Sequence, residues 1–205
     1  GGEVDRPARH LCWACAATGG FIEAPYCERC GDPVDGVTGH AYTCGWCARE
    51  RPDFVRARSA VRYRGPWRHA IHALKYEGQL CVAEDLADLL QAVWTTHFAD
   101  RPLDAVTYVP LHARRERERT YNQARVLAQG LGRRLRRPLL TALRRLRDTG
   151  SQTELDAARR RENVRGAFAA VDADWLRGRH LLVIDDVMTT GATVGECARV
   201  LNGAG

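Results

Sequence analysis

The chain has 205 residues, of which 45% are hydrophobic and 27% charged, and these are ordinary proportions for a folded globular protein. They exclude a disordered or fibrous chain, and no apolar run approaches the roughly 20 residues that a membrane helix needs. The formal net charge is +6, a mild excess that does not by itself identify a nucleic-acid-binding protein.

Nothing in the sequence has the form of an export signal, so we expect a soluble, cytoplasmic protein that does not enter a membrane. The first residue is Gly1 and the only methionine is Met188. We therefore expect residues to be missing at the front of the chain.

Six of the eight cysteines form three Cys-x-x-Cys pairs within the first fifty residues. Two sulfurs at this spacing on a tight turn face one tetrahedral ion, and a second pair completes a four-cysteine zinc site. Cys27 with Cys30 and Cys44 with Cys47 have this form, with thirteen residues between the pairs. A closed shell of four thiolates leaves no position for substrate, so we interpret the Zn2+ as structural. A thioredoxin-type redox pair is the alternative, but this Gly-rich, Pro-interrupted stretch lacks the β-α-β context of that motif.

The third pair, Cys12 and Cys15, has no fourth pair to complete its shell. These two residues either ligate a second zinc with ligands from outside this sequence, use His10 or His40 instead, or bind no metal. The two remaining cysteines, Cys81 and Cys197, lie in helix-like segments, and we expect both to be small buried hydrophobes.

From about residue 57 onward, strand and helix patterns alternate. Hydrophobic periodicity predicts strands over 59–63, 105–109 and 180–185, and helices over 66–76, 82–98, 122–135 and 192–201. This alternation predicts an α/β fold with a parallel sheet and helices on both of its faces. Ligands of such sheets bind at the carboxyl ends of the strands.

Positive charge is concentrated in the middle of the chain. Between His112 and Arg165 there are sixteen arginines and only six acidic residues. Because Lys75 is the only lysine, nearly all of the positive charge is guanidinium, which binds phosphate or carboxylate through two nitrogens. A GC-rich genome would produce the same preference for arginine.

The most informative stretch follows the last predicted strand, where Asp185 and Asp186 precede a hydroxyl-rich loop around Gly191 and then a helix. The loop from Thr189 to Thr193 offers backbone N–H groups, three hydroxyls and the positive end of a helix, which together suit a phosphate dianion. Two carboxylates would repel that phosphate, so they need a neighbouring sugar diol or hydrated Mg2+. A phosphate beside a diol describes a ribose 5-phosphate. The alternative is a helix cap with ordinary turn residues.

These residues carry a resemblance to a known group of enzymes. The stretch from Asp185 to Thr193 resembles the signature by which type I phosphoribosyltransferases bind phosphoribosyl pyrophosphate (PRPP), and almost the whole chain resembles the ComF family within that group. Besides the cysteine pairs, the resemblance rests on five further segments, 62–66, 71–76, 109–112, 119–123 and 163–168. It implies a type I phosphoribosyltransferase fold over residues 57–205 and a small Cys-rich zinc-ribbon module over residues 8–52.

The resemblance also implies roles for individual residues. Asp185 and Asp186 would hold the ribose hydroxyls of PRPP, which binds with Mg2+, and act in catalysis. The loop that follows would bind the rest of PRPP through Val187, Thr189, Thr190, Gly191, Ala192 and Thr193. The segment with Leu111 and His112 resembles the pyrophosphate loop, with Arg114 or Arg115 available to the leaving group and Arg114 expected to act in catalysis. Residues 144–165 resemble a mobile loop that closes over the site.

Two functions remain open at this point. The first is an enzyme that transfers, or a protein that only binds, a 5-phosphoribosyl group, for an acceptor that the sequence does not name. The second is a competence or DNA-uptake protein that binds single-stranded DNA or DNA-processing proteins through the zinc module and the Arg-rich region, with Trp13, Trp46 and Trp67 as stacking surfaces. The paired aspartates favour the enzyme, and the clustered charge favours DNA.

The chain departs from the ComF pattern in two places. Members commonly have four cysteine pairs and a further strand after the last helix, whereas this chain has three pairs and stops at Gly205. Both differences fit a chain truncated at both ends. The sequence does not predict an oligomeric state.

Overall fold

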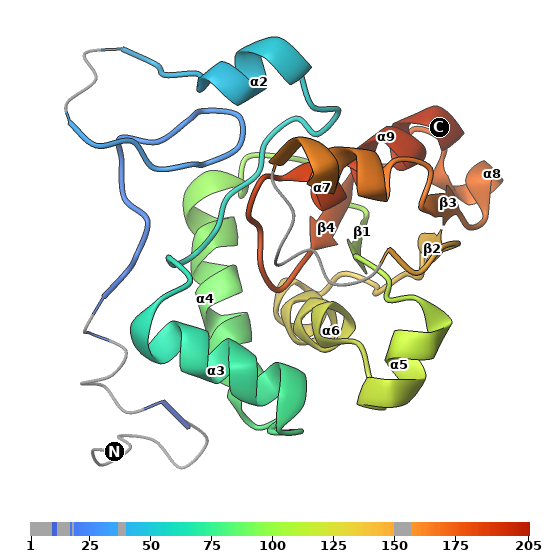
Figure 1. Ribbon diagram of the computed structural model, residues 1–205, viewed down its shortest axis with the longest axis horizontal. Helices are drawn as coiled ribbons and strands as arrows, with labels where there is room; N and C mark the ends of the chain where they lie inside the picture. Colours follow the sequence, from blue (N-terminus) through green and yellow to red (C-terminus); the bar gives the residue numbers. More distant parts are fainter. Residues whose placement is uncertain (1–9, 12–16, 18, 37–39, 150–156) are drawn as a thin grey trace. The chain divides into compact units, whose positions relative to one another are not determined.

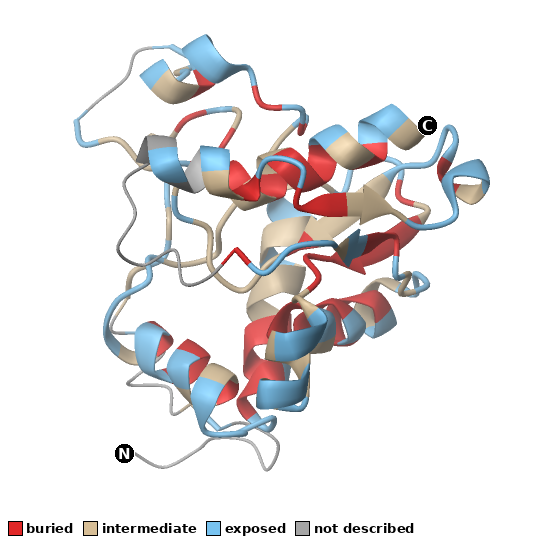
Figure 2. Ribbon diagram, turned by 45° about the vertical axis from the view of Figure 1, so that its right-hand side comes forward, coloured by how far each residue is buried: buried red, intermediate tan, exposed pale blue. Residues whose placement is uncertain are grey.

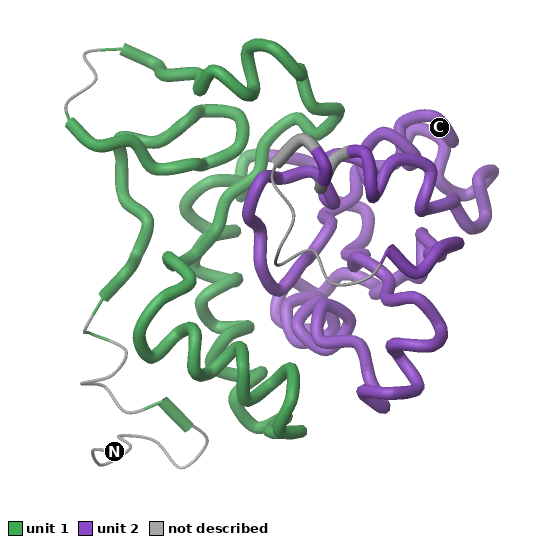
Figure 3. The backbone as a smooth tube through the Cα atoms, in the orientation of Figure 1, with its two compact units in different colours: residues 1–100 green, residues 101–205 purple. Residues whose placement is uncertain are grey.

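The computed structural model describes residues 10–11, 17, 19–36, 40–149 and 157–205 (Figure 1). Contacts divide the chain into two compact units, Gly1–Asp100 and Arg101–Gly205 (Figure 3). The first unit thus includes the predicted helices over 66–76 and 82–98 as well as the cysteine pairs. The domain boundary expected between residues 52 and 57 stays a prediction, because contacts alone define these units.

In the first unit, helices α3 (Gly65–Tyr76) and α4 (Val82–His97) pack against each other. Pro66 lies in the first turn of α3, where its missing N–H costs no hydrogen bond. The buried side chains recur at helical spacing, namely Trp67, Ala70, Ile71 and Leu74 on α3 and Val82, Ala83, Leu86 and Ala87 on α4. Both helices agree with the prediction to within one residue.

The strand predicted over 59–63 is not formed. Only Val61 pairs, in a single antiparallel bridge with Phe21, flanked by hydrogen bonds from the N–H of Ile22 to the Ala60 carbonyl and from the N–H of Arg62 to the Gly20 carbonyl. The ladder ends there because Gly19 and Gly20 have φ of 98° and 88°, outside the extended region that a strand requires.

The centre of the second unit is a pair of parallel strands, β1 (Ala105–Tyr108) and β4 (Leu181–Ile184), in register from Ala105 opposite Leu181 to Tyr108 opposite Ile184. Val106 also forms a parallel bridge with Leu139 on its other side. The strands lie between α9 (Ala192–Ala204) and α6 (Gln123–Leu135), as Figure 2 shows. This arrangement confirms the predicted α/β class with a parallel sheet.

The helix α6 approaches β1 closely at Gly132. A Cβ at this position would lie 3.0 Å from the Arg137 carbonyl oxygen and 3.9 Å from a methyl group of Val106. A side chain there would therefore meet the strand at ordinary van der Waals distance but would crowd the Arg137 carbonyl just after the helix.

A second, antiparallel pair of strands joins β2 (Leu143–Arg145) to β3 (Phe168–Ala170). The remaining helices of this unit are short: α5 (Ala113–Arg119), α7 (Ala157–Val164) and α8 (Ala173–Leu176). Residues 144–165, which resemble a mobile loop, begin in β2 and include α7, so the segment is irregular at neither end. Its closure over the site stays a prediction. In the described part of the chain, no helix is long and apolar enough to cross a membrane.

Candidate functional site

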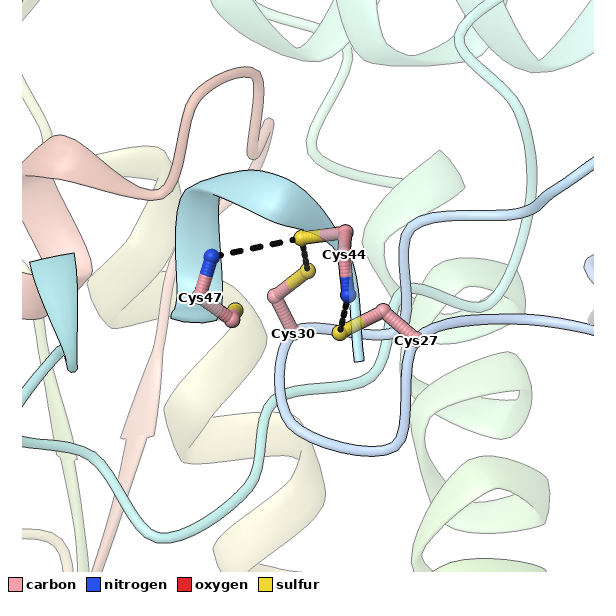
Figure 4. Close-up of side chains that lie close together, drawn as sticks. All are labelled: Cys27, Cys30, Cys44 and Cys47. Atoms are coloured by element: carbon pink, nitrogen blue, oxygen red, sulfur yellow. Dashed lines mark hydrogen bonds between the residues drawn. The ribbon is translucent and has the colours of Figure 1, made fainter. Parts of the chain in front are cut away.

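Four of the cysteines predicted to bind zinc come together in the first unit. The Sγ atoms of Cys27, Cys30, Cys44 and Cys47 all lie within 4.8 Å of one another (Figure 4). The Sγ atoms of Cys30 and Cys44 are 3.7 Å apart. A tetrahedron with zinc–sulfur bonds of about 2.3 Å has sulfur–sulfur edges of about 3.8 Å. The four side chains therefore fit a single Zn2+ ion.

Local hydrogen bonds shape this cluster. The N–H of Gly31 donates to the Cys27 carbonyl at 2.8 Å, and Gly31 itself has φ of 72°, which closes the turn that carries the first pair. A Cβ on Gly31 would lie 2.8 Å from the Ala57 carbonyl oxygen, so glycine is needed there. The second pair caps helix α2 (Gly45–Glu50), where the Cys44 sulfur accepts a hydrogen bond from the Cys47 N–H at 3.4 Å.

The environment of the thiols explains why a cation suits them. Burial raises the pKa of Cys30 to about 12 and raises that of Cys47 above the usual thiol range. Burial also acts to raise the pKa of Cys27, but backbone N–H groups, including that of Cys44 at 3.3 Å, outweigh it and lower this pKa to about 7. Four thiolates packed this closely need a divalent cation to offset their mutual repulsion.

The other cysteines have different outcomes. Cys12 and Cys15 lie outside the described residues, so the second zinc shell stays a prediction. Cys197 is fully buried on α9, as expected, and burial, followed by the negative charge of Asp185, raises its pKa. The expectation for Cys81 is wrong: this residue is exposed because it precedes the first turn of α4 and none of the described elements covers it there.

The tryptophans predicted as stacking surfaces differ in their exposure. Trp67 is 2% exposed, and its Nε1 donates to the Gly19 carbonyl at 2.9 Å, so it belongs to the core and offers no stacking surface. Trp46 is partly exposed, and its ring packs 6.2 Å from that of Phe54. Trp13 lies outside the described residues.

In the second unit, strand pairing brings two of the predicted segments to the same edge of the sheet. The N–H of Val109 donates to the Ile184 carbonyl at 2.9 Å, so the segment with Leu111 and His112 begins beside Asp185. His112 caps α5, and its Nδ1 accepts a hydrogen bond from the Arg114 N–H at 3.4 Å. The predicted pyrophosphate segment and the paired aspartates therefore meet at the carboxyl ends of β1 and β4.

The loop after β4 has an open helix terminus. Gly191 is the N-cap of α9 with φ of 71°, and no side chain among the described residues caps the helix there. The Ala192 N–H makes a long contact of 3.4 Å with the Thr190 hydroxyl, and the Asp186 N–H donates to Asp185 Oδ1 at 2.9 Å. Thr189 is exposed and Val187 and Thr193 are partly exposed, so the loop borders solvent.

The two arginines expected beside the pyrophosphate have acidic partners in this structure. Arg115 Nε lies 3.4 Å from Asp148 Oδ1, with both side chains largely covered. Arg114 Nε lies 2.9 Å from Glu118 Oε1 on the exposed side of α5. Arg115 is therefore held near the strand ends, whereas Arg114 is held along its own helix.

The sequence interpretation missed Arg145, the last residue of β2. Its guanidinium lies 5.4 Å from the centre of the Phe168 ring, hydrogen-bonds to Thr149, and has a buried Nε without a partner among the described residues. Burial, followed by the charge of Arg115, lowers the pKa of Arg145, and the charge of Asp185 opposes this shift. No sequence signal separates Arg145 from the fifteen other arginines between residues 112 and 165, because only the β2–β3 pairing places it beside Phe168.

Comparisons with known proteins give three informative relatives, while no family model matches the sequence. The chain is 33% identical to competence protein F of Haemophilus influenzae over 187 residues, covering 88% of this chain and 80% of that protein. It is 32% identical to DNA utilization protein YhgH of Escherichia coli K12, covering 95% and 92%. It is 25% identical to competence protein ComFC of Bacillus subtilis, covering 96% and 79%.

Proposed function

This chain belongs to the ComF family of competence and DNA-utilization proteins, and we propose that the loop following β4 binds PRPP together with Mg2+. The observation that carries the proposal is the order of groups from Asp185 to Thr193 at the carboxyl end of a parallel strand. Two acids come first, and a loop that ends in an uncapped helix N-terminus follows.

Each part of PRPP has a chemical counterpart at this edge. The N–H groups at the start of α9 and the threonine hydroxyls suit the 5-phosphate. Asp185 and Asp186 accept hydrogen bonds from the ribose hydroxyls, or ligate Mg2+ directly or through water. Arg115, with Arg145 nearby, suits the pyrophosphate, which would replace Asp148 as the partner of Arg115.

Transfer of the phosphoribosyl group is the reaction that such a site supports. The bond between C1 of the ribose and pyrophosphate breaks, the pyrophosphate leaves with the electron pair, and a lone pair of the acceptor forms the new bond to C1. The protein contributes orientation and positive charge around the leaving group. Pyrophosphate release from Mg2+ and PRPP in the presence of a panel of nucleobases tests for turnover and for the acceptor.

The binding proposal is tested with the paired aspartates. Isothermal titration calorimetry with Mg2+ and PRPP should show binding to the wild type and none to Asp185→Asn with Asp186→Asn, because two amides do not replace the carboxylates. The control is Asp172→Asn with Asp174→Asn, which makes the same charge change at exposed positions around α8. Equal affinity of the wild type and the Asp185/Asp186 variant would refute the assignment.

Binding of single-stranded DNA is a second candidate function, favoured by the names of the relatives and by the arginines between residues 112 and 165. Binding that depends on arginine–phosphate contacts releases counterions and therefore weakens with salt. The affinity for an oligonucleotide should fall about tenfold or more between low and physiological ionic strength. An affinity independent of salt would contradict this function.

A further inference from the structure

A second stretch rich in positive charge lies in the first unit. Residues 54–76 include five arginines and one lysine but no Asp or Glu. Two of these arginines serve the fold: Arg56 donates to the His97 carbonyl at 2.8 Å, and Arg58, with 3% of its side chain exposed, pairs with Glu28 at 3.3 Å. The other three, Arg62, Arg64 and Arg68, are exposed around the start of α3.

The described acidic residues do not neutralise these three arginines. Within the part of the chain that the structure describes, none of them forms an ion pair with a carboxylate, and α3 itself has no acidic residue. Arg62 and Arg64 both lie beside Gly20: a Cβ there would be 3.7 Å from Arg64 Nε and 3.8 Å from Arg62 Cβ. The charges are therefore gathered on one short, hydrogen-bonded segment and remain available to an anion.

Two exposed aromatic rings accompany these arginines: Tyr63 lies between Arg62 and Arg64, and Phe21 pairs with the neighbouring Val61. Phe21 is 46% exposed, and Tyr63 is 44% exposed. The Phe21 ring packs against the buried Trp67, with centroids 6.0 Å apart and ring planes inclined at 64°. The Phe21 backbone pairs with Val61, two residues before Tyr63. Phe21 is thus held by a buried ring and by backbone pairing while about half of its surface stays exposed.

We propose that Phe21, Tyr63, Arg62, Arg64 and Arg68 form a surface that binds single-stranded nucleic acid, an inference that rests on the proposed association with DNA. Unpaired bases stack on exposed rings, and arginines beside the rings bind the phosphates between the bases. A duplex keeps its bases stacked on one another and gains nothing from the rings. An acidic peptide would use the arginines alone, so the rings favour the single strand.

The stacking contact is tested at Tyr63 with the full chain and a fluorescein-labelled twelve-residue oligothymidylate in an anisotropy titration. Tyr63→Leu keeps an apolar side chain but removes the ring, and should weaken binding about tenfold. Tyr63→Trp should restore it. Because Tyr63 is exposed, neither change disturbs the core, and a thermal melt of each variant verifies this.

The phosphate contacts are tested by salt dependence. Arg62→Gln with Arg64→Gln should reduce the slope of log affinity against log salt by about 1.4, since each contact to a single strand contributes about 0.7. Arg177→Gln with Arg179→Gln removes the same charge near α8, outside both proposed DNA-binding regions, and should change the slope by less than half as much.

The possible results separate this inference from the function on which it rests. If the wild type binds the oligonucleotide and the Tyr63 and Arg62/Arg64 variants bind it equally well, this surface is wrong and the DNA function stands. If the wild type does not bind, both fall. If polyglutamate competes as well as the oligonucleotide and Tyr63→Leu changes nothing, the surface binds an acidic protein and the inference is overturned.

Discussion

Asn122 is a single residue that links the predicted pyrophosphate segment to α6. It is 2% exposed, its amide donates to the Val109 carbonyl at 3.0 Å, and its Oδ1 caps α6 by accepting from the Arg125 N–H at 3.2 Å. One side chain thereby fixes where the chain leaves β1 and where the next long helix begins.

Replacing Asn122 should destabilise the fold. Asn122→Ala removes the helix cap, at about 1 kcal/mol, and leaves the Val109 carbonyl unpaired, at about another 1 kcal/mol. Asn122→Ser keeps a capping oxygen and should lose about half as much. Urea unfolding measures both free energies, and an alanine variant within about 0.5 kcal/mol of the wild type would contradict the double role.

At the residue scale, the sequence predicts groups whose chemistry depends on spacing along the chain. The cysteine pairs are of this kind, and the structure brings two of the pairs, four cysteines in all, together. It does not predict partners that are distant in the sequence, such as Asp148 for Arg115, or the exposure of Cys81. These depend on which elements pack together, and one sequence does not contain that information in local form.

Among the elements, α9 connects the candidate phosphate loop to the turn that follows α7. Glu196, 8% exposed on α9, accepts from the Gly166 N–H at 2.7 Å and from Arg199 at 2.7 and 2.8 Å. The hydrogen bond from Arg199 lowers the Glu196 pKa below its usual value of 4.5, and the bond from the Gly166 N–H acts in the same direction. Burial raises this pKa but does not outweigh the two hydrogen bonds.

This carboxylate should make stability depend on pH. Because the folded pKa is lower than the unfolded one, its contribution is full above pH 4.5 and is lost as the pH falls through the folded pKa. Glu196→Gln should therefore lower the free energy of unfolding at pH 7 by about 1 to 2 kcal/mol and flatten its decline in acid. The control is Asp174→Asn, because the Asp174 side chain is 92% exposed. This variant should change neither the free energy of unfolding at pH 7 nor its decline in acid. An unchanged acid profile in Glu196→Gln would exclude this role.

Zinc binding by the cluster of Cys27, Cys30, Cys44 and Cys47 can be tested by changing one of its cysteines. We expect Cys27→Ser to lose bound Zn2+ and the near-ultraviolet circular dichroism of the surrounding aromatic residues, since a small segment with few buried side chains relies on the metal to fold. Cys81→Ser replaces an exposed thiol outside the cluster and should retain both. Elemental analysis measures the zinc. A Cys27→Ser protein that keeps as much zinc per chain as the wild type would contradict the assignment of these cysteines as ligands.

Across the whole molecule, the long elements are the ones that the sequence predicts. The helices α3, α4, α6 and α9 and the parallel pair β1–β4 are confirmed. The helices carry hydrophobic periodicity over several turns, and the two strands are continuous runs of apolar or β-branched residues, fully buried in β1 and partly buried in β4. The antiparallel β2–β3 pair was missed, since three-residue strands carry almost no periodicity. The strand over 59–63 was predicted wrongly because local pattern does not reveal whether a partner strand is present.

The most direct test of the PRPP proposal is a crystal structure of the protein with Mg2+ and PRPP. The account predicts that the 5-phosphate accepts hydrogen bonds from the backbone N–H groups between Thr189 and Thr193, with Asp185 and Asp186 at the ribose hydroxyls or the metal. PRPP bound elsewhere on the chain, or bound with both aspartates turned away from the ribose and the metal, would contradict it.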